Sequence, residues 1–185
     1  MQQTQPYGIR QLTASMRTVR ENTIRIAEDI PEPSYGYRPT PESRSVAELL
    51  VHIAWLASAD RFLHEEARVG SIEGVDFGAL MAHSRSEEKL PRTKAEIIEL
   101  LRSEGARYVQ WVEQLPEAFL AEQVGWPGGG SKSRFEMFVG TKEHEMQHRA
   151  QLTVLERLVG IVPHFSRNQP VAREAAELTS VGDAT

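Results

Sequence analysis

The sequence predicts an all-α protein built as a four-helix bundle, and three observations support this fold class. Four segments of roughly 20–26 residues place apolar side chains at helical spacing. Three of these segments begin with a capping box, in which Ser or Thr is followed three residues later by Glu. No segment shows the alternation of a strand. Four helices with one apolar face each are packed most economically in an antiparallel-type bundle.

The first predicted helix covers residues 9–30, where Ile9, Leu12 and Met16 begin an apolar stripe. Pro31 ends it, because proline has no N–H to donate and disfavours helical geometry in the residue before it. Residues 31–41 then form an extended connection. The second predicted helix runs over residues 45–68, from a Ser45–Glu48 capping box to a stop at Gly70.

Residues 70–91 form the longest irregular stretch, with a short helical turn near 77–82, and are expected to bridge two helix ends and partly cover a site. The third predicted helix covers residues 93–115 and the fourth covers residues 133–160, with residues 117–130 as a connection between them. We expect one domain over residues 1–185, with a core at about 8–162. In the tail, 163–185, residues 172–178 are either helical or disordered.

Two histidines on the fourth predicted helix are the strongest functional signal. His144 and His148 lie about 40° apart around the helix axis and one turn apart, so both imidazoles can reach one ion. Thr141 and Gln151 share their face, which is apolar at both ends. Burying polar groups costs about 1–3 kcal/mol each unless they are paired or ligated. The polar residues in the middle of this apolar face therefore form either a hydrogen-bonded network or a metal site.

The second predicted helix offers a third imidazole. His52 points along an apolar stripe one turn after Glu48, and taken alone it is equally a core-edge histidine hydrogen-bonded to a neighbour. Bundle cores build metal sites from inward side chains on facing helices. Three imidazoles with open positions for water are typical of a catalytic site, whereas structural zinc is usually closed by four protein ligands.

Composition excludes several other functions. The 185 residues carry a net charge of −5 without a basic cluster, which argues against nucleic-acid binding through phosphates. The chain has no cysteine, and so has no disulfide, thiolate ligand or cysteine nucleophile. It shows neither a signal peptide nor an apolar run long enough to span a bilayer. We expect a cytoplasmic protein without membrane contact.

Two segments resemble the signatures of a known family. Residues 37–54, YRPTPESRSVAELLVHIA, resemble the second-helix signature of DinB-like (YfiT-like) proteins. Residues 143–152, EHEMQHRAQL, resemble their fourth-helix signature, with Ala150 where the family often has glycine. The resemblance covers roughly residues 8–162. It implies a four-helix bundle of the DinB/YfiT-like type with a long loop between helices 2 and 3.

The resemblance also implies a function. His52, His144 and His148 would bind a divalent metal ion: zinc, nickel, iron, cobalt or manganese. The family is frequently dimeric and includes thiol-dependent transferases, a mycothiol-dependent isomerase and metal hydrolases. We therefore expect a homodimeric, metal-dependent enzyme that acts on a small-molecule substrate by activating water or an external low-molecular-weight thiol. The alternatives are a non-catalytic metal-binding or stress-response module, and a pH-sensitive histidine network without metal.

Other polar residues receive secondary roles. Glu48 and Gln151 are expected to orient the imidazoles. Glu145 is a candidate base, with a solvated or helix-capping role as the alternative, and Asp60 is a candidate extra ligand. The remaining histidines are expected on the surface or in loops: His64, His83 and His164.

Overall fold

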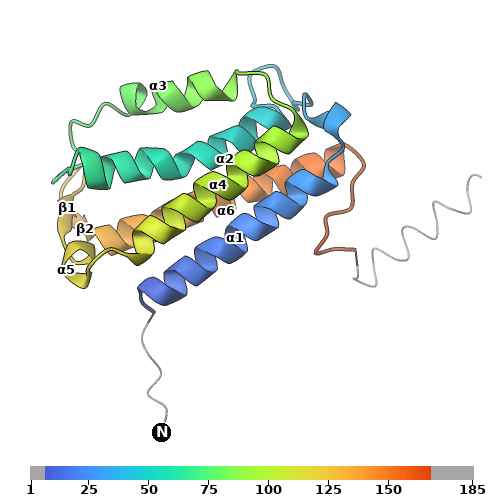
Figure 1. The fold of residues 1–185 in the computed structure, drawn as a ribbon. Coiled ribbons are helices and arrows are strands. Elements are labelled where there is room, and N and C mark those ends of the chain that lie inside the picture. Colours follow the sequence, from blue (N-terminus) through green and yellow to red (C-terminus); the bar gives the residue numbers. More distant parts are fainter. Residues whose placement is uncertain (1–6, 168–185) are drawn as a thin grey trace, which may run out of the picture.

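The computed structural model describes residues 7–167, whose helices form a four-helix bundle (Figure 1). Its four long helices are α1 (Ile9–Asp29), α2 (Val46–Arg61), α4 (Lys94–Glu113) and α6 (Arg134–Leu158). Both α1 and α2 pack against α4 and α6. The helix-or-disorder expectation for residues 172–178 falls outside the described residues.

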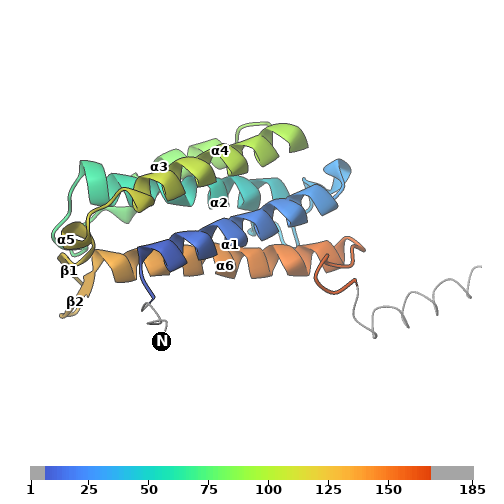
Figure 2. The same ribbon diagram turned by 60° about the horizontal axis from the view of Figure 1, so that its bottom comes forward.

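The direction of the helices differs from a simple antiparallel arrangement. α1 and α6 run one way and α2 and α4 run the other way, so the neighbours α2 and α4 are parallel (Figure 1). The reason is α3 (Phe77–Glu88), a full helix where the sequence predicted only a short turn. Asp76 caps α3 by accepting a hydrogen bond from the backbone N–H of Ala79 at 2.9 Å. α3 carries the chain back along α2, and α2 lies between α3 and α6 in both views (Figures 1 and 2).

The capping boxes set the starts of three bundle helices as predicted. Ser45, Thr93 and Ser133 each accept a hydrogen bond from the backbone N–H three residues on, and the glutamate there returns one. The end of α2 is different, because a π-helical turn, η2 (Phe62–Glu66), replaces the last predicted α-helical residues. A single 3-10 turn, η1 (Glu32–Ser34), follows α1.

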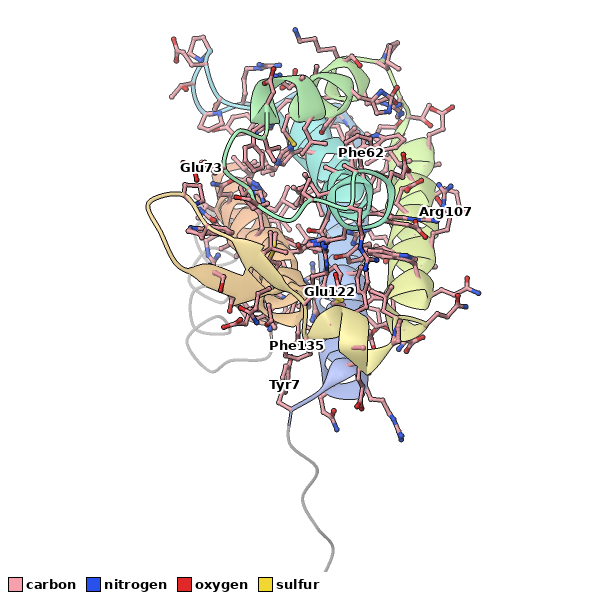
Figure 3. The ribbon with its side chains drawn as sticks, turned by 90° about the vertical axis from the view of Figure 1, so that its left-hand side faces the viewer. Tyr7, Phe62, Glu73, Arg107, Glu122 and Phe135 are labelled. Atoms are coloured by element: carbon pink, nitrogen blue, oxygen red, sulfur yellow. The ribbon has the colours of Figure 1, made fainter. Side chains whose placement is uncertain are left out.

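A short hairpin closes one end of the bundle (Figure 3). After α5 (Glu117–Leu120), the strands β1 (Gln123–Gly125) and β2 (Ser131–Ser133) pair antiparallel. The sequence did not predict these strands, because three residues are too few to show an alternating pattern. The loop between them contains three consecutive glycines with positive φ, a geometry that other residues rarely adopt: Gly128, Gly129 and Gly130. At the same end, the rings of Tyr7 and Phe135 meet edge to face at 6.3 Å.

The apolar core consists of two clusters along the bundle. One cluster contains Ile26, Leu50 and Leu152, and the other contains Leu12 and Phe138, all fully buried. Each long helix contributes to at least one of them. Within residues 7–167, no helix is both long and apolar enough to cross a membrane.

A buried ion pair lies between these two clusters. Arg20 on α1 donates to both carboxylate oxygens of Glu145 on α6, at 2.9 and 3.0 Å. The same guanidinium reaches the backbone oxygens of Leu101 on α4 and Ile53 on α2, at 2.8 and 3.3 Å. A Cβ at Gly105 would lie 2.9 Å from Arg20 Nη1, so this position needs glycine. One side chain therefore links all four bundle helices.

Candidate metal centre

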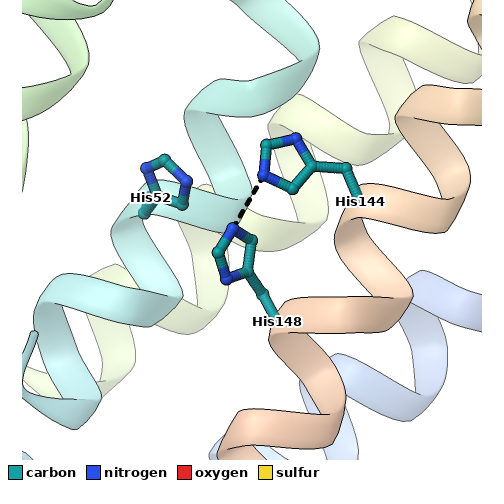
Figure 4. Close-up of side chains that lie close together, drawn as sticks. All are labelled: His52, His144 and His148. Atoms are coloured by element: carbon teal, nitrogen blue, oxygen red, sulfur yellow. Dashed lines mark hydrogen bonds between the residues drawn. The ribbon is translucent and has the colours of Figure 1, made fainter.

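Three histidines meet between α2 and α6 (Figure 4). His52 comes from α2, whereas His144 and His148 lie one turn apart on α6. Each imidazole offers one nitrogen, and these three atoms lie within 4.8 Å of one another. The Nε2 atoms of His144 and His148 are 2.9 Å apart. The structure thus brings together all three imidazoles predicted from the sequence.

The outer nitrogens of two imidazoles are held by neighbouring side chains. His52 Nδ1 lies 2.8 Å from a carboxylate oxygen of Glu88 on α3. His148 Nδ1 lies 3.0 Å from Oε1 of Gln151, one turn further along α6. Both oxygens are acceptors, so we assign the proton to Nδ1 in each ring. The Nε2 lone pairs of His52 and His148 are then directed away from these partners and are available as ligands.

The electrostatic surroundings favour neutral imidazoles. Burial lowers the pKa of His52 to about 4, helped by the nearby Arg44 guanidinium and opposed by Glu88. Burial, His148 and Arg44 also lower the pKa of His144. Metal ions bind the neutral form of imidazole, so these shifts keep ligand nitrogens free at neutral pH.

The donor set fits a divalent metal ion. Zn–N bonds of about 2.0–2.1 Å at tetrahedral angles place ligand nitrogens about 3.3 Å apart, close to the observed separation of the two Nε2 atoms on α6. His52 and His148 are 4% and 8% exposed, whereas His144 is exposed to solvent. Two of the candidate ligands are therefore buried, and the third, His144, is open to solvent.

Glu88 is the functional residue that the sequence analysis missed. Its side chain is 9% exposed and accepts two hydrogen bonds from Arg44, at 2.8 and 3.3 Å, besides its contact with His52. It ties α3 and the segment before α2 to the centre. No local pattern distinguishes Glu88 from the neighbouring acidic residue Glu87, because its role depends on where α3 packs.

Of the four expected secondary roles, that of Gln151 was correct and those of Glu48, Glu145 and Asp60 were wrong. Gln151 orients His148, as expected. Glu48 instead completes the capping box of α2 and pairs with Arg38 at 3.1 Å. Glu145 pairs with Arg20 and accepts from Thr23, so it is neither solvated nor placed as a base.

Asp60 and His64 lie side by side outside the histidine cluster, with His64 Nε2 3.6 Å from Asp60 Oδ1. Asp60 accepts hydrogen bonds from Tyr108 and from Thr141, the latter at 2.9 Å, and it is not among the clustered ligand atoms. The surface prediction for His64 was wrong: its ring is fully buried, and Nδ1 accepts from Arg134 at 2.8 Å. The π-helical turn η2 places this ring inside the protein.

The other two histidines lie outside the centre, as expected. His83 is exposed on α3, where its ring meets Trp55 edge to face at 5.0 Å. His164 follows α6 and lies beside Asp29.

The fold and the interhelical histidine cluster together define a helical-bundle protein with a candidate metal centre. A sequence model of the DinB superfamily matches residues 15–152, and the chain belongs to this superfamily. Among curated proteins, no sequence matches the chain.

Solved structures share the fold at low sequence identity. A DinB-like protein, YjoA, from Bacillus subtilis is 23% identical, with a TM-score of 0.60 over 82% of this chain and 93% of its own. YfiT from Bacillus subtilis, described as a probable metal-dependent hydrolase with an unusual four-helix bundle topology, is 15% identical, with a TM-score of 0.61 over 88% and 95%. A mycothiol-dependent maleylpyruvate isomerase is 14% identical, with a TM-score of 0.63 over 90% of this chain and 66% of its own.

Proposed function

We propose that the protein is a metal-dependent enzyme whose divalent ion is held by His52, His144 and His148. The observation that carries this proposal is the meeting of three imidazole nitrogens within 4.8 Å, two of them oriented by Glu88 and Gln151. The hydrogen bond between His144 and His148 on α6 does not by itself require the third imidazole, His52, to come within 4.8 Å from another helix. The description of YfiT as a probable metal-dependent hydrolase supports the metal, and that of the isomerase as mycothiol-dependent supports an external thiol.

The arrangement suits activation of a small nucleophile. When bound, a divalent ion would lower the pKa of a coordinated water or thiol and make it nucleophilic near neutral pH. The chain has no cysteine, so a thiol would come from an external low-molecular-weight compound. The buried His52 and His148 would hold the ion from inside the bundle, and the exposed His144 would leave access for a small-molecule substrate. Three imidazoles accept zinc, nickel, iron, cobalt or manganese.

Metal analysis of protein purified without a chelating tag tests the site. We expect near-stoichiometric divalent metal in the wild type and its loss in His144→Ala. His83→Ala is the matched control, because it removes an exposed imidazole outside the cluster. If wild-type protein from cells grown in zinc-supplemented medium contains no metal after purification, the proposal is refuted.

An activity screen then separates an enzyme from a non-catalytic metal-binding module. Metal-loaded protein is assayed with bacterial thiols and electrophiles, and in parallel with ester and amide substrates. We expect turnover in one of the panels that His144→Ala abolishes and His83→Ala retains. A fully metallated protein that is inactive in both panels would instead favour the module.

We further propose a single domain and a homodimer, as the family resemblance implies. Light scattering of the purified chain measures the oligomeric state directly. A monomer at micromolar concentration would contradict the homodimer without affecting the metal site.

A further inference from the structure

A large pocket borders the histidine centre at the N-terminal end of α2. Its volume is about 770 Å³, and its walls come from α2, α3, α6 and the segment before α2. Two of its lining residues are Glu88 and Gln151, which hold His52 and His148 through their outer nitrogens. We call this cavity the α3–α6 pocket. Any molecule in it lies directly beside the side chains that orient the metal ligands.

One side of the α3–α6 pocket is rich in cations. Four cationic side chains line it, against three carboxylates: Arg38, Arg44, Arg85 and Lys89, against Glu42, Glu48 and Glu88. Two of the cations are already matched, because Arg38 pairs with Glu48 and Arg44 pairs with Glu88. Within residues 7–167, neither Arg85 nor Lys89 pairs with a carboxylate. Arg85 donates one hydrogen bond, from Nη2 to the backbone oxygen of Gly78. It lies one turn before Lys89, so a change of its rotamer brings both cations to one anion.

The opposite wall of the pocket is apolar. Leu49 and Leu155 form buried surface at its base. Val154 and Leu158 on α6 are each 55% exposed, although they line a concave surface. Covering apolar side chains in a concave site is favourable in proportion to the area removed from water. The pocket thus offers a charged end and an apolar wall to the same ligand.

We infer that the α3–α6 pocket binds an organic carboxylate with an apolar body, and that this is the substrate class of the neighbouring centre. The carboxylate is held by Arg85 and Lys89, and the apolar body lies against Val154 and Leu158. The substrate assignment rests on the proposed metal-dependent function. Binding of the anion to the pocket does not depend on the metal-dependent function, so anion binding and metal content are tested separately.

A matched pair of fluorescent probes tests the charge requirement. 8-Anilinonaphthalene-1-sulfonate carries an anionic group on an apolar body, and N-phenyl-1-naphthylamine is the same body without the anion. We expect the sulfonate to bind at least tenfold more tightly than the neutral probe. In the Arg85→Glu/Lys89→Glu variant this preference should disappear, through at least a tenfold weaker binding of the sulfonate. Octanoate should displace the sulfonate, and octylammonium should not.

A control variant separates a local effect from a change in net charge. Arg10→Glu/Lys132→Glu makes the same change in net charge at exposed positions away from the pocket, and it should bind the sulfonate like the wild type. The inference is overturned if Arg85→Glu/Lys89→Glu binds the sulfonate as tightly as the wild type does. It is also overturned if both double variants lose the same share of the wild-type sulfonate affinity.

Metal content is measured in the same samples. Retained metal with lost sulfonate binding in Arg85→Glu/Lys89→Glu supports the inference. If the wild type holds no metal yet binds the sulfonate as expected, the proposed function and the substrate assignment fail while the anion site stands.

Discussion

Glu156 on α6 should make the stability of the protein fall as pH rises. Its side chain is fully buried, and neither carboxylate oxygen has a hydrogen-bond partner among the described residues. Burial raises its pKa from 4.5 to about 7, helped by Asp29 at the end of α1 and opposed by Arg167 and Arg157. The folded protein therefore holds a proton that the unfolded chain has already released.

The sign and size of the effect follow from this difference. Between pH 4.5 and about 7 the folded state binds more protons than the unfolded state, so the free energy of unfolding decreases with pH. At 1.36 kcal/mol per pKa unit, the full penalty above pH 7 is about 3 kcal/mol. Glu156→Gln carries no such proton and escapes the penalty. Its advantage over the wild type should grow from near zero at acidic pH to about 3 kcal/mol at alkaline pH.

The difference in free energy of unfolding between Glu156→Gln and the wild type is measured by urea unfolding across the pH range. A chelator is present, so that bound metal does not contribute. In thermal unfolding the same advantage corresponds to about 6–12 °C for a chain of this size. Glu143→Gln, an exposed change on the same helix, is the control and should track the wild type. A pH-independent difference between Glu156→Gln and wild type would refute the reasoning.

Two further predictions concern side chains that connect elements. Glu88→Gln removes the carboxylate that orients His52, so metal affinity should fall about 10–100-fold. Competition with a chelator measures this affinity. An unchanged affinity would contradict an orienting role for Glu88. Arg20→Met leaves Glu145 buried without its partner and should cost about 3–5 kcal/mol in chemical denaturation, whereas Arg20→Met/Glu145→Leu should recover most of the loss. A double variant no more stable than the single one would show that the pair itself is essential.

The parts of the fold predicted from sequence are those encoded locally. Capping boxes at Ser45, Thr93 and Ser133 fixed the starts of three helices, because both partners of a box lie within four residues. The pair His144 and His148 was visible for the same reason, since helical periodicity alone puts both rings on one face.

The parts that were missed depend on contacts between distant segments. α3 has little amphipathic pattern and only one buried residue, Ser84, so periodicity could not reveal it. The role of Glu88 follows from the packing of α3 on α2. Arg20 and Glu145 are separated by 125 positions, and their pairing appears only once all four helices are assembled. His64 was predicted on the surface or in a loop, whereas a π-helical turn in place of the predicted end of the second helix buries its ring.

The position of α3 has a consequence for how new selectivities can arise. Its side chains contribute to neither apolar cluster, yet they supply Glu88 and Arg85 to the α3–α6 pocket. Mutations there are spared the cavity and overpacking costs that accompany changes in a packed interior. With Glu88 kept as the partner of His52 and Ser84 kept as the buried contact, the other residues of 77–89 can therefore be exchanged between relatives, or randomised in a library, on an unaltered scaffold.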